Sequence, residues 1–350
     1  MAKRISQDQI AKELGVSQSL VSLVLNGRRE GVAEESYKMI WAAALKQGYV
    51  PRGGMHPMHA PDVQHSYVGV VMRAGLALAA QSNTFSHVSH GLFTALQHLN
   101  ISLAFLGGEG DLDETKLFEV VSRRDPLLGI VILGEVKEPF MQALGELELK
   151  LVSVYASSPG LCHSIVPNDK QSVEQLVDHL VALGHTRFAW LGGNAKLGRN
   201  RLRLAALKER LAARDLLLDD RYVVNAEGAE RQDGFDCAAE LMRRAEGQNM
   251  PTAWVCHNGL IARGGLQFAY LRGIKVPGEI SIAAVDRTRA CTEIHPYLTS
   301  AASDPELIGA EAAKLLRSQP EEIGQWNKMF IDLVAPSLFE AGETSATRPE

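Results

Sequence analysis

From Tyr67 onward, apolar strand-like runs alternate with helical stretches, and this alternation limits the possible folds most. Parallel strands need long crossover connections, which helices supply, so the pattern predicts parallel sheets with helices on both faces. The predicted strands and helices are more than one sheet with its covering helices usually contains, so two doubly wound α/β subdomains are expected. We predict strands at 67–72, 102–106, 129–133, 151–155, 188–191, 253–256 and 282–285, and helices at 88–99, 117–122, 173–183, 204–213, 235–244 and 261–271.

The first 50 residues have a different, all-helical pattern. Ser6 and Ser17 are each followed by apolar residues at helical spacing, so each is a candidate N-cap. Gly15 separates these two short helices, and a third is expected from 33 to 47. Two helices joined by a tight turn that contains glycine are typical of a helix-turn-helix unit. The chain is therefore expected to begin with a small all-α helix-turn-helix head.

Residues 51–66 are rich in proline, glycine and histidine, which indicates a linker. His56, His59 and His65 lack the fixed spacing of metal ligands, so no metal site is predicted there. The predicted organisation is a helix-turn-helix head at 1–50, a linker or hinge at 51–66, a two-lobed α/β body at 67–340, and a C-terminal tail at 341–350.

Charge is unevenly distributed along the chain. The net charge is −5, but the first 60 residues hold eight basic and five acidic residues, a balance of +3. A positive head on an acidic body suggests a polyanion partner for the head alone, although a solvated surface would explain so small an excess equally well. The four cysteines form no CxxC pair, and neither an apolar signal segment nor a membrane-spanning run is seen, so a cytoplasmic protein without a membrane partner is expected.

Two other classes of function fit the sequence less well. A solute-binding protein for transport is disfavoured by the helical head and the lack of a signal peptide. An enzyme is disfavoured because the sequence holds no phosphate loop, no GxSxG elbow and no metal motif. His185 and His257 have no identifiable acid–base partner, so structural roles are expected for them. No catalytic residue and no cofactor are predicted.

The order of several motifs resembles the LacI/GalR family of transcription regulators. In the head the motifs lie at 9–11, 14–17, 21–22, 24–26 and 48–51, and in the body at 179–185, 273–281 and 296–300. The resemblance implies a periplasmic-binding-protein-like body with a small-molecule cleft between two α/β lobes. It also implies a sequence-specific regulator, a repressor, whose affinity for pseudo-palindromic double-stranded operator DNA shifts when a sugar-like effector binds. Either an inducer or a corepressor is compatible with this scheme. Because the C-terminus lacks leucine heptads, a homodimer is expected rather than a coiled-coil tetramer.

The resemblance also assigns positions that contact DNA. Gln18 and Ser19 fall where the family reads bases, and Leu23 stands where many members have arginine, so it offers an apolar contact or belongs to the core. Met58 falls at the position of the hinge leucine that the family wedges into the minor groove, but Pro57 and two glycines favour a flexible linker. The remaining expected contacts, mainly to phosphates, are Ser6, Ser17, Ser22, Asn26, Arg28 and Tyr49.

The expected cleft residues are carried over from the same resemblance. Arg203 and Asp286 match polar anchors of the family and are expected to grip a sugar from opposite lobes. Glu230 stands where some members stack an aromatic ring, so an amino sugar paired with Glu230 is favoured over a plain hexose. The other candidates are Phe85, Ser86, Asn168 from the Asn-Asp pair at 168–169, and Asn258.

Overall fold

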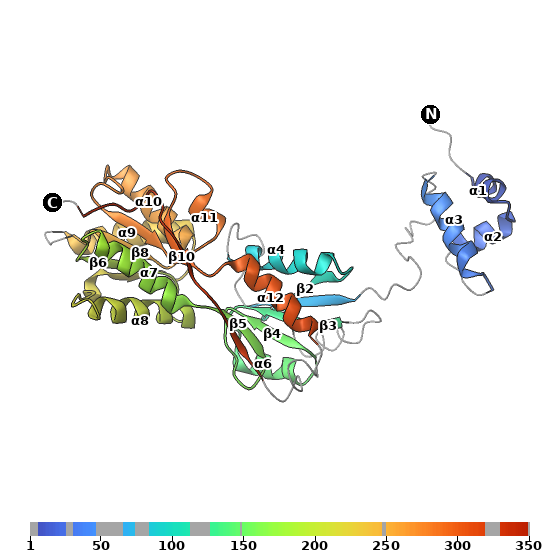
Figure 1. Ribbon diagram of the computed structural model, residues 1–350, viewed down its shortest axis with the longest axis horizontal. Helices are drawn as coiled ribbons and strands as arrows, with labels where there is room; N and C mark the ends of the chain where they lie inside the picture. Colours follow the sequence, from blue (N-terminus) through green and yellow to red (C-terminus); the bar gives the residue numbers. More distant parts are fainter. Residues whose placement is uncertain are drawn as a thin grey trace. The chain divides into compact units, whose positions relative to one another are not determined.

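The computed structural model describes residues 6–25, 31–46, 66–73, 84–112, 127–147, 149–246, 250–318 and 330–348. The chain divides into two compact units, residues 1–65 and 66–350, and each is considered by itself. Figure 1 shows three short helices in the first unit and two sheets flanked by helices in the second. None of the described helices is both long and apolar enough to span a membrane.

The head consists of α1 (Gln7–Leu14), α2 (Gln18–Leu25) and α3 (Glu34–Lys46). Its first two helices begin as the sequence predicts. The Ser6 side chain accepts from the backbone N–H of Gln9 in a capping box, and the Ser17 hydroxyl accepts from Leu20. Gly15 ends α1 in the left-handed conformation, at φ +65°. The core of the head consists of Ile10, Ala11, Val21, Val24, Leu25, Tyr37, Ile40, Ala43 and Ala44.

The first lobe of the body contains a six-stranded parallel sheet in the order β11-β5-β4-β3-β1-β2. Helices α4 and α12 cover one face of this sheet, and α6 covers the other. The strands are β1 (Tyr67–Met72), β2 (Ser102–Gly108), β3 (Leu127–Leu133), β4 (Leu151–Val154), β5 (His163–Pro167) and β11 (Asp332–Ala335), and the helices are α4 (Thr84–Gln97), α6 (Glu138–Gly145) and α12 (Pro305–Arg317).

The second lobe contains a six-stranded sheet in the order β12-β10-β9-β8-β6-β7, parallel except for the β10–β12 pair. Helices α9 and α10 pack on one face, and α7 and α8 pack on the other. Its strands are β6 (Phe188–Gly192), β7 (Val223–Asn225), β8 (Ala253–Cys256), β9 (Ser281–Ala284), β10 (Thr299–Ala302) and β12 (Leu338–Glu340). Its helices are α7 (Asp169–Ala182), α8 (Gly198–Ala212), α9 (Arg231–Ala245), α10 (Gly259–Leu271) and the short α11 (Arg289–Thr292).

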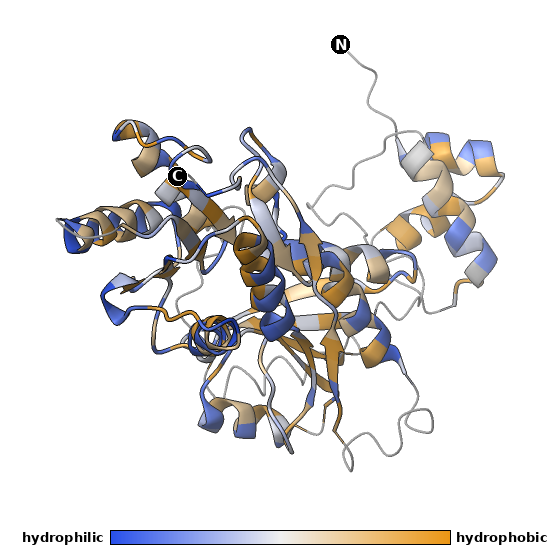
Figure 2. Cartoon of the chain, turned by 60° about the vertical axis from the view of Figure 1, so that its left-hand side comes forward, coloured by the Kyte–Doolittle hydropathy of each residue, from blue (hydrophilic) through white to orange (hydrophobic). Residues whose placement is uncertain are grey.

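The hydropathy of the elements follows from these layers. In Figure 2 the strands are mostly hydrophobic, whereas the helices carry hydrophobic and hydrophilic residues together. A strand covered by helices on both faces buries every side chain, as β1, β4, β6, β8 and β9 do, while a helix buries only one stripe. The predicted fold class, a helical head followed by two doubly wound parallel-sheet subdomains, is confirmed.

The chain crosses between the lobes three times, after β5, after β10 and after β11. The three crossing segments are hydrogen-bonded to one another. The backbone N–H of Asn168 donates to the carbonyl of Ala335 and lies 3.2 Å from the Ser303 hydroxyl, which itself donates to Ala335. These three segments form a shared hinge on which the lobes can rotate.

The end of the chain differs from expectation. Residues 341–350 were predicted to be a separate tail, but as far as residue 348 they pack on the second lobe. Thr344 is fully buried and exchanges hydrogen bonds with Ile282, and His185 contacts the carbonyl of Ala346. Of the predicted linker at 51–66, all but residue 66 lies outside the described residues, and so does the predicted helix at 117–122.

Candidate functional site

The helix α2 carries the residues expected to read DNA. Gln18 and Ser19 are exposed at its first turn, so their side chains are available to a partner. Leu23 is partly exposed and is not among the residues of the head's core, while Ser22 is half-buried. Ser17 lies at the N-terminus of α2, 3.0 Å from the Ser19 hydroxyl. The other expected contacts, Asn26, Arg28, Tyr49 and Met58, lie outside the described residues.

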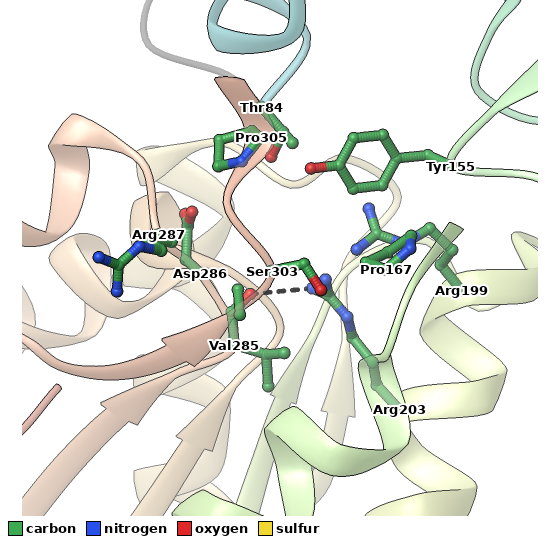
Figure 3. A pocket seen from close by; sticks show the side chains of 11 residues that line it. Thr84, Tyr155, Pro167, Arg199, Arg203, Val285, Asp286, Arg287, Ser303 and Pro305 are labelled. Atoms are coloured by element: carbon green, nitrogen blue, oxygen red, sulfur yellow. Dashed lines mark hydrogen bonds between the residues drawn. The ribbon is translucent and has the colours of Figure 1, made fainter. Parts of the chain in front are cut away.

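The body contains a polar pocket where the carboxyl ends of the strands of both lobes meet. In open parallel sheets this is the edge at which ligands bind. Tyr155 and Arg199 lie on one side of the pocket, and Asp286 and Arg287 lie on the other (Figure 3). The cavity volume here is about 10 Å³, which is room for about one water molecule. A second cavity of about 330 Å³ shares Arg287 and Pro305 with it and is also lined by residues of both lobes. The lining residues are Thr84, Tyr155, Pro167, Arg199, Arg203, Val285, Asp286, Arg287, Ala302, Ser303 and Pro305.

A buried charge cluster occupies the second-lobe side of the cleft. Asp169, at the start of α7, accepts two hydrogen bonds from Arg199 and two from Arg203, all at 2.8–2.9 Å. Burial opposes ionisation of Asp169, but the two guanidinium groups outweigh it and hold the pKa of the carboxyl well below its usual range. Arg203 also donates to the carbonyls of His257 and Val285 (Figure 3 draws the latter bond), so it is fixed in place.

The expectation that Arg203 and Asp286 grip a ligand from opposite lobes is wrong. Arg203 lies on α8 and Asp286 follows β9, and both elements belong to the second lobe. Asp286 is already engaged, because it accepts from the backbone N–H of Gly259 at 2.7 Å and from both the backbone and the hydroxyl of Thr288. The topology places them together because the strand order of the second sheet brings β6 and β9 to either side of β8.

Two of the expected polar residues cap helices. Asn258 accepts from Ile261 at the start of α10 and donates to the carbonyl of Ala229. Asn168 accepts from Gln171 at the start of α7, so its neighbour Asp169, and not Asn168, supplies the charged group of the cleft. Ser and Asn residues before helices often have this role, because the first N–H groups of a helix lack partners.

The aromatic side of the cleft comes from the first lobe. Tyr155 follows β4, at φ +69°, and the Arg199 guanidinium lies 4.4 Å from the centre of its ring. Phe85, at the start of α4, packs edge-on against Tyr155 with ring centres 5.8 Å apart, and Ser86 beside it is exposed. Glu230 is exposed in a capping box with Asp233 at the start of α9 and does not line the pocket. The structure therefore gives no support to an amino sugar paired with Glu230.

Contacts between described residues join the lobes across the cleft at two places. The carboxylate of Glu135, which follows β3 in the first lobe, accepts from the Gly198 N–H at the start of α8 at 2.8 Å, and Arg199 in the same turn lies over the Tyr155 ring. The backbone N–H of Arg289 in α11 donates to Nε2 of His87 in α4 at 3.3 Å. The first turn of α8 and the start of α11 are therefore parts of the second lobe that meet the first.

Sequence reasoning missed Arg73, Glu135, Tyr155, Arg199 and His257. A signal for four of them was present, because each follows directly, or within two residues, the end of a predicted strand or forms its last position. The carboxyl ends of parallel strands meet at one edge of the sheet, so residues just after strands are candidates for a site. Arg199 lacks this signal and is found only through the packing of α8.

Comparisons with known proteins agree with this architecture. Residues 177–326 match the model of a periplasmic binding protein-like domain. The chain is 22% identical over 331 residues to the HTH-type transcriptional repressor PurR of Aliivibrio fischeri (strain MJ11), covering 92% of this chain and 93% of that one. It is 23% identical over 317 residues to the HTH-type transcriptional regulator DegA of Bacillus subtilis (strain 168), covering 86% and 87%. Both matches extend over most of this chain and of the relative.

These matches support the LacI/GalR family of transcription regulators, to which the sequence motifs also point. Solved structures show the same fold. A lac repressor dimer bound to operator and the anti-inducer ONPF matches with TM-score 0.69 and 21% identity over 98% of this chain and 100% of that chain. A transcriptional regulator CelR–cellobiose complex matches with TM-score 0.66 and 20% identity over 97% and 100%. This chain thus combines a helix-turn-helix head with a two-lobed body.

Proposed function

We propose that this chain represses transcription by binding a pseudo-palindromic operator as a homodimer, and that a small effector in the cleft between its lobes shifts its DNA affinity. The observation that carries the proposal is the union of the two parts in one chain. A head with an exposed α2 precedes a body whose lobes meet over a polar cleft, and relatives named as transcriptional regulators share both parts.

The hinge between the lobes gives the effector a means of action. The lobes turn on a hinge at Asn168, Ser303 and Ala335, and they contact each other at the first turn of α8 and at α11. An effector shifts the equilibrium between two arrangements of the lobes only by its difference in affinity for them. It acts as an inducer if it favours the arrangement with the lower operator affinity, and as a corepressor if it favours the other.

The test begins with the full chain and a random DNA library. Sequences enriched over repeated selection should form a palindrome, and a gel shift at physiological salt should show far tighter binding to it than to a scrambled duplex. Gln18→Ala should relax base preference at one position of each half-site, costing about 1–3 kcal/mol there. Arg28→Ala is the matched control, because loss of a phosphate contact weakens all sequences alike. A chain that shows no base preference at any position would refute the proposal.

Cleft residues give the second test. Tyr155→Ala removes an aromatic side chain that lines the cleft, and a ligand that packs against this ring should bind at least tenfold more weakly. Tyr270→Ala is the matched control, because Tyr270 is 82% exposed on α10 and does not line the pocket. Equal effects of the two substitutions on effector binding would place the effector site elsewhere.

A further inference from the structure

We propose that the effector of this regulator is an anion, a small polar molecule that carries a carboxylate or phosphate group, and that Arg73 of the first lobe is the residue that recognises this charge. The inference rests on the proposed function and narrows it to one class of ligand. It begins from the charges that face the cleft and from the partners that each of them already has.

Cations of both lobes lie at or beside the cleft. Arg199, Arg203 and Arg287 of the second lobe line it, and Arg73, which follows β1 in the first lobe, lies beside it. The Arg73 side chain lies against Gly134 next to Phe85, since a Cβ atom placed on Gly134 would meet Arg73 Cδ at 3.1 Å and Phe85 Cζ at 3.2 Å. Phe85 in turn contacts Tyr155, which lines the pocket. Arg73 is therefore a neighbour of the aromatic side of the cleft.

The carboxylates of the cleft are committed to other groups. Asp169 is held by Arg199 and Arg203, and Asp286 accepts three hydrogen bonds from its own lobe. Among the residues that the structure describes, no carboxylate forms an ion pair with Arg73, and its buried Nε has no hydrogen-bond partner. A buried guanidinium donor without an acceptor is costly, so this atom favours a ligand that supplies one.

A second unsatisfied group lies in the same region. The buried Nδ1 of His257, which follows β8, also has no hydrogen-bond partner among the described residues. Burial and the nearby Arg203, Arg199 and Arg73 lower the pKa of His257 well below its usual range, so the ring is neutral. Burial and Arg199 likewise lower the pKa of Arg73. The cations of the two lobes therefore repel one another, and an anion between them would remove this repulsion.

Glu135 occupies part of this region in the closed cleft. Its carboxylate accepts from Gly198 N–H, and its charge also acts on Arg73. Because the Glu135 residue is exposed, its side chain can turn into solvent at little cost. An incoming carboxylate or phosphate would take its place near Arg73 and the first turn of α8, where the helix dipole also favours negative charge. Displacing Glu135 breaks one of the contacts that join the lobes, so anion binding weakens the closed arrangement.

A neutral sugar lacks this advantage. Its hydroxyls could accept from Arg73, but they would leave the repulsion between Arg73 and Arg199 in place. They would also compete poorly with the carboxylate of Glu135 for the Gly198 N–H, because hydrogen bonds to charged acceptors are roughly twice as strong as neutral ones. The charge of a ligand therefore affects its affinity for the cleft more than its shape does.

The experiment is calorimetric titration of the full chain with matched probes. Glucose 6-phosphate and glucuronate carry a phosphate and a carboxylate on the same ring as glucose, glucosamine carries a cation, and inorganic phosphate lacks the ring. We expect at least one of the two anionic sugars to bind about tenfold or more tightly than glucose and glucosamine. The stronger of the two identifies the anion as phosphate or carboxylate, and phosphate alone should bind more weakly than glucose 6-phosphate.

Three variants assign the effect to residues. Arg73→Gln should abolish the preference for the anionic sugar, whereas Glu135→Gln, which removes the competing charge, should raise its affinity. Arg201→Gln is the matched control, since Arg201 is an exposed cation on the same helix as Arg199 and should change neither. Opposite effects of the first two variants cannot arise from misfolding, which would weaken binding in both.

The inference is overturned if neither anionic sugar binds more tightly than glucose, or if Arg73→Gln keeps the preference for the anion. Operator binding measured on the same preparation separates this outcome from failure of the proposed function. If the chain binds its selected operator but prefers neutral sugars, the anionic effector is refuted and the proposed regulatory function stands. If the chain has no preferred operator, the proposed regulatory function itself is refuted.

Discussion

The effect of burial on how much an ion pair contributes to stability can be tested within this chain, because two aspartates each lie between a pair of arginines. Asp169 on α7 is paired with Arg199 and Arg203 on α8, and Asp178, further along α7, is paired with Arg210 and Arg214. The chemistry and the helix pair are the same, but the exposure differs. The Asp169 and Arg203 side chains are 9% and 5% exposed, whereas those of Asp178 and Arg214 are 36% and 42% exposed.

The expected magnitudes differ accordingly. Asp169→Asn keeps the size of the side chain but leaves the buried Arg203 without its counter-charge, and removing one partner of a buried pair costs about 3–5 kcal/mol. Asp178→Asn breaks a solvated pair, for which about 0–1 kcal/mol is expected. With an m-value of about 3 kcal/mol/M, the urea midpoint should fall by about 1–1.7 M for Asp169→Asn and by about 0.3 M or less for Asp178→Asn.

Urea unfolding of the full-length variants measures this difference. Trp190 and Trp254 are fully buried in the second lobe, so tryptophan fluorescence reports its unfolding, and far-UV circular dichroism checks whether both probes give one transition. Equal shifts of the midpoint for Asp169→Asn and Asp178→Asn would refute the reasoning, because burial would then not decide the strength of the pair. A stabilised Asp169→Asn would refute it as well.

Three further outcomes are expected. Ser6→Ala should destabilise the head by about 1 kcal/mol through loss of the α1 cap, measured as the thermal midpoint of the head, while a body that loses stability instead would contradict this role. Gly309→Ala should destabilise the first lobe because its Cβ would collide with the Val88 carbonyl of α4, whereas Gly145→Ala, with open space around it, should be nearly neutral in the same urea titration. Burial lowers the pKa of His185, so the folded chain keeps this ring neutral and the unfolded chain takes up its proton near pH 6.5. Stability should therefore be complete above about pH 6.5 and fall as the pH decreases below it, and His185→Gln should flatten that slope in urea midpoints measured from pH 5 to 8.

Local features of the fold were predictable from the sequence. The strands β1 and β8 have the predicted bounds, because continuous apolar runs between polar segments mark strands that are buried on both faces. The caps Ser6, Ser17 and Gly15 were equally visible, since a cap depends on residues within one turn of the helix. The strands β11 and β12 were missed, because they are short and largely exposed and pair with β5 and β10 across long stretches of chain.

The sequence by itself therefore predicted the helical head, the alternation of strands and helices in the body, and the resemblance to the family. These features depend on local sequence patterns and on the order of the motifs. Only the tertiary structure decided which polar residues meet. The chain crosses between the lobes three times, so distance along the sequence does not tell whether two residues share a lobe, and Arg203 and Asp286 proved to lie together. It also decided which charges are already paired, because Asp169, Asp286 and Asn258 could all serve a ligand until their partners are known. Pairing is a property of distances below about 4 Å, and such distances are set when the sheets and helices pack.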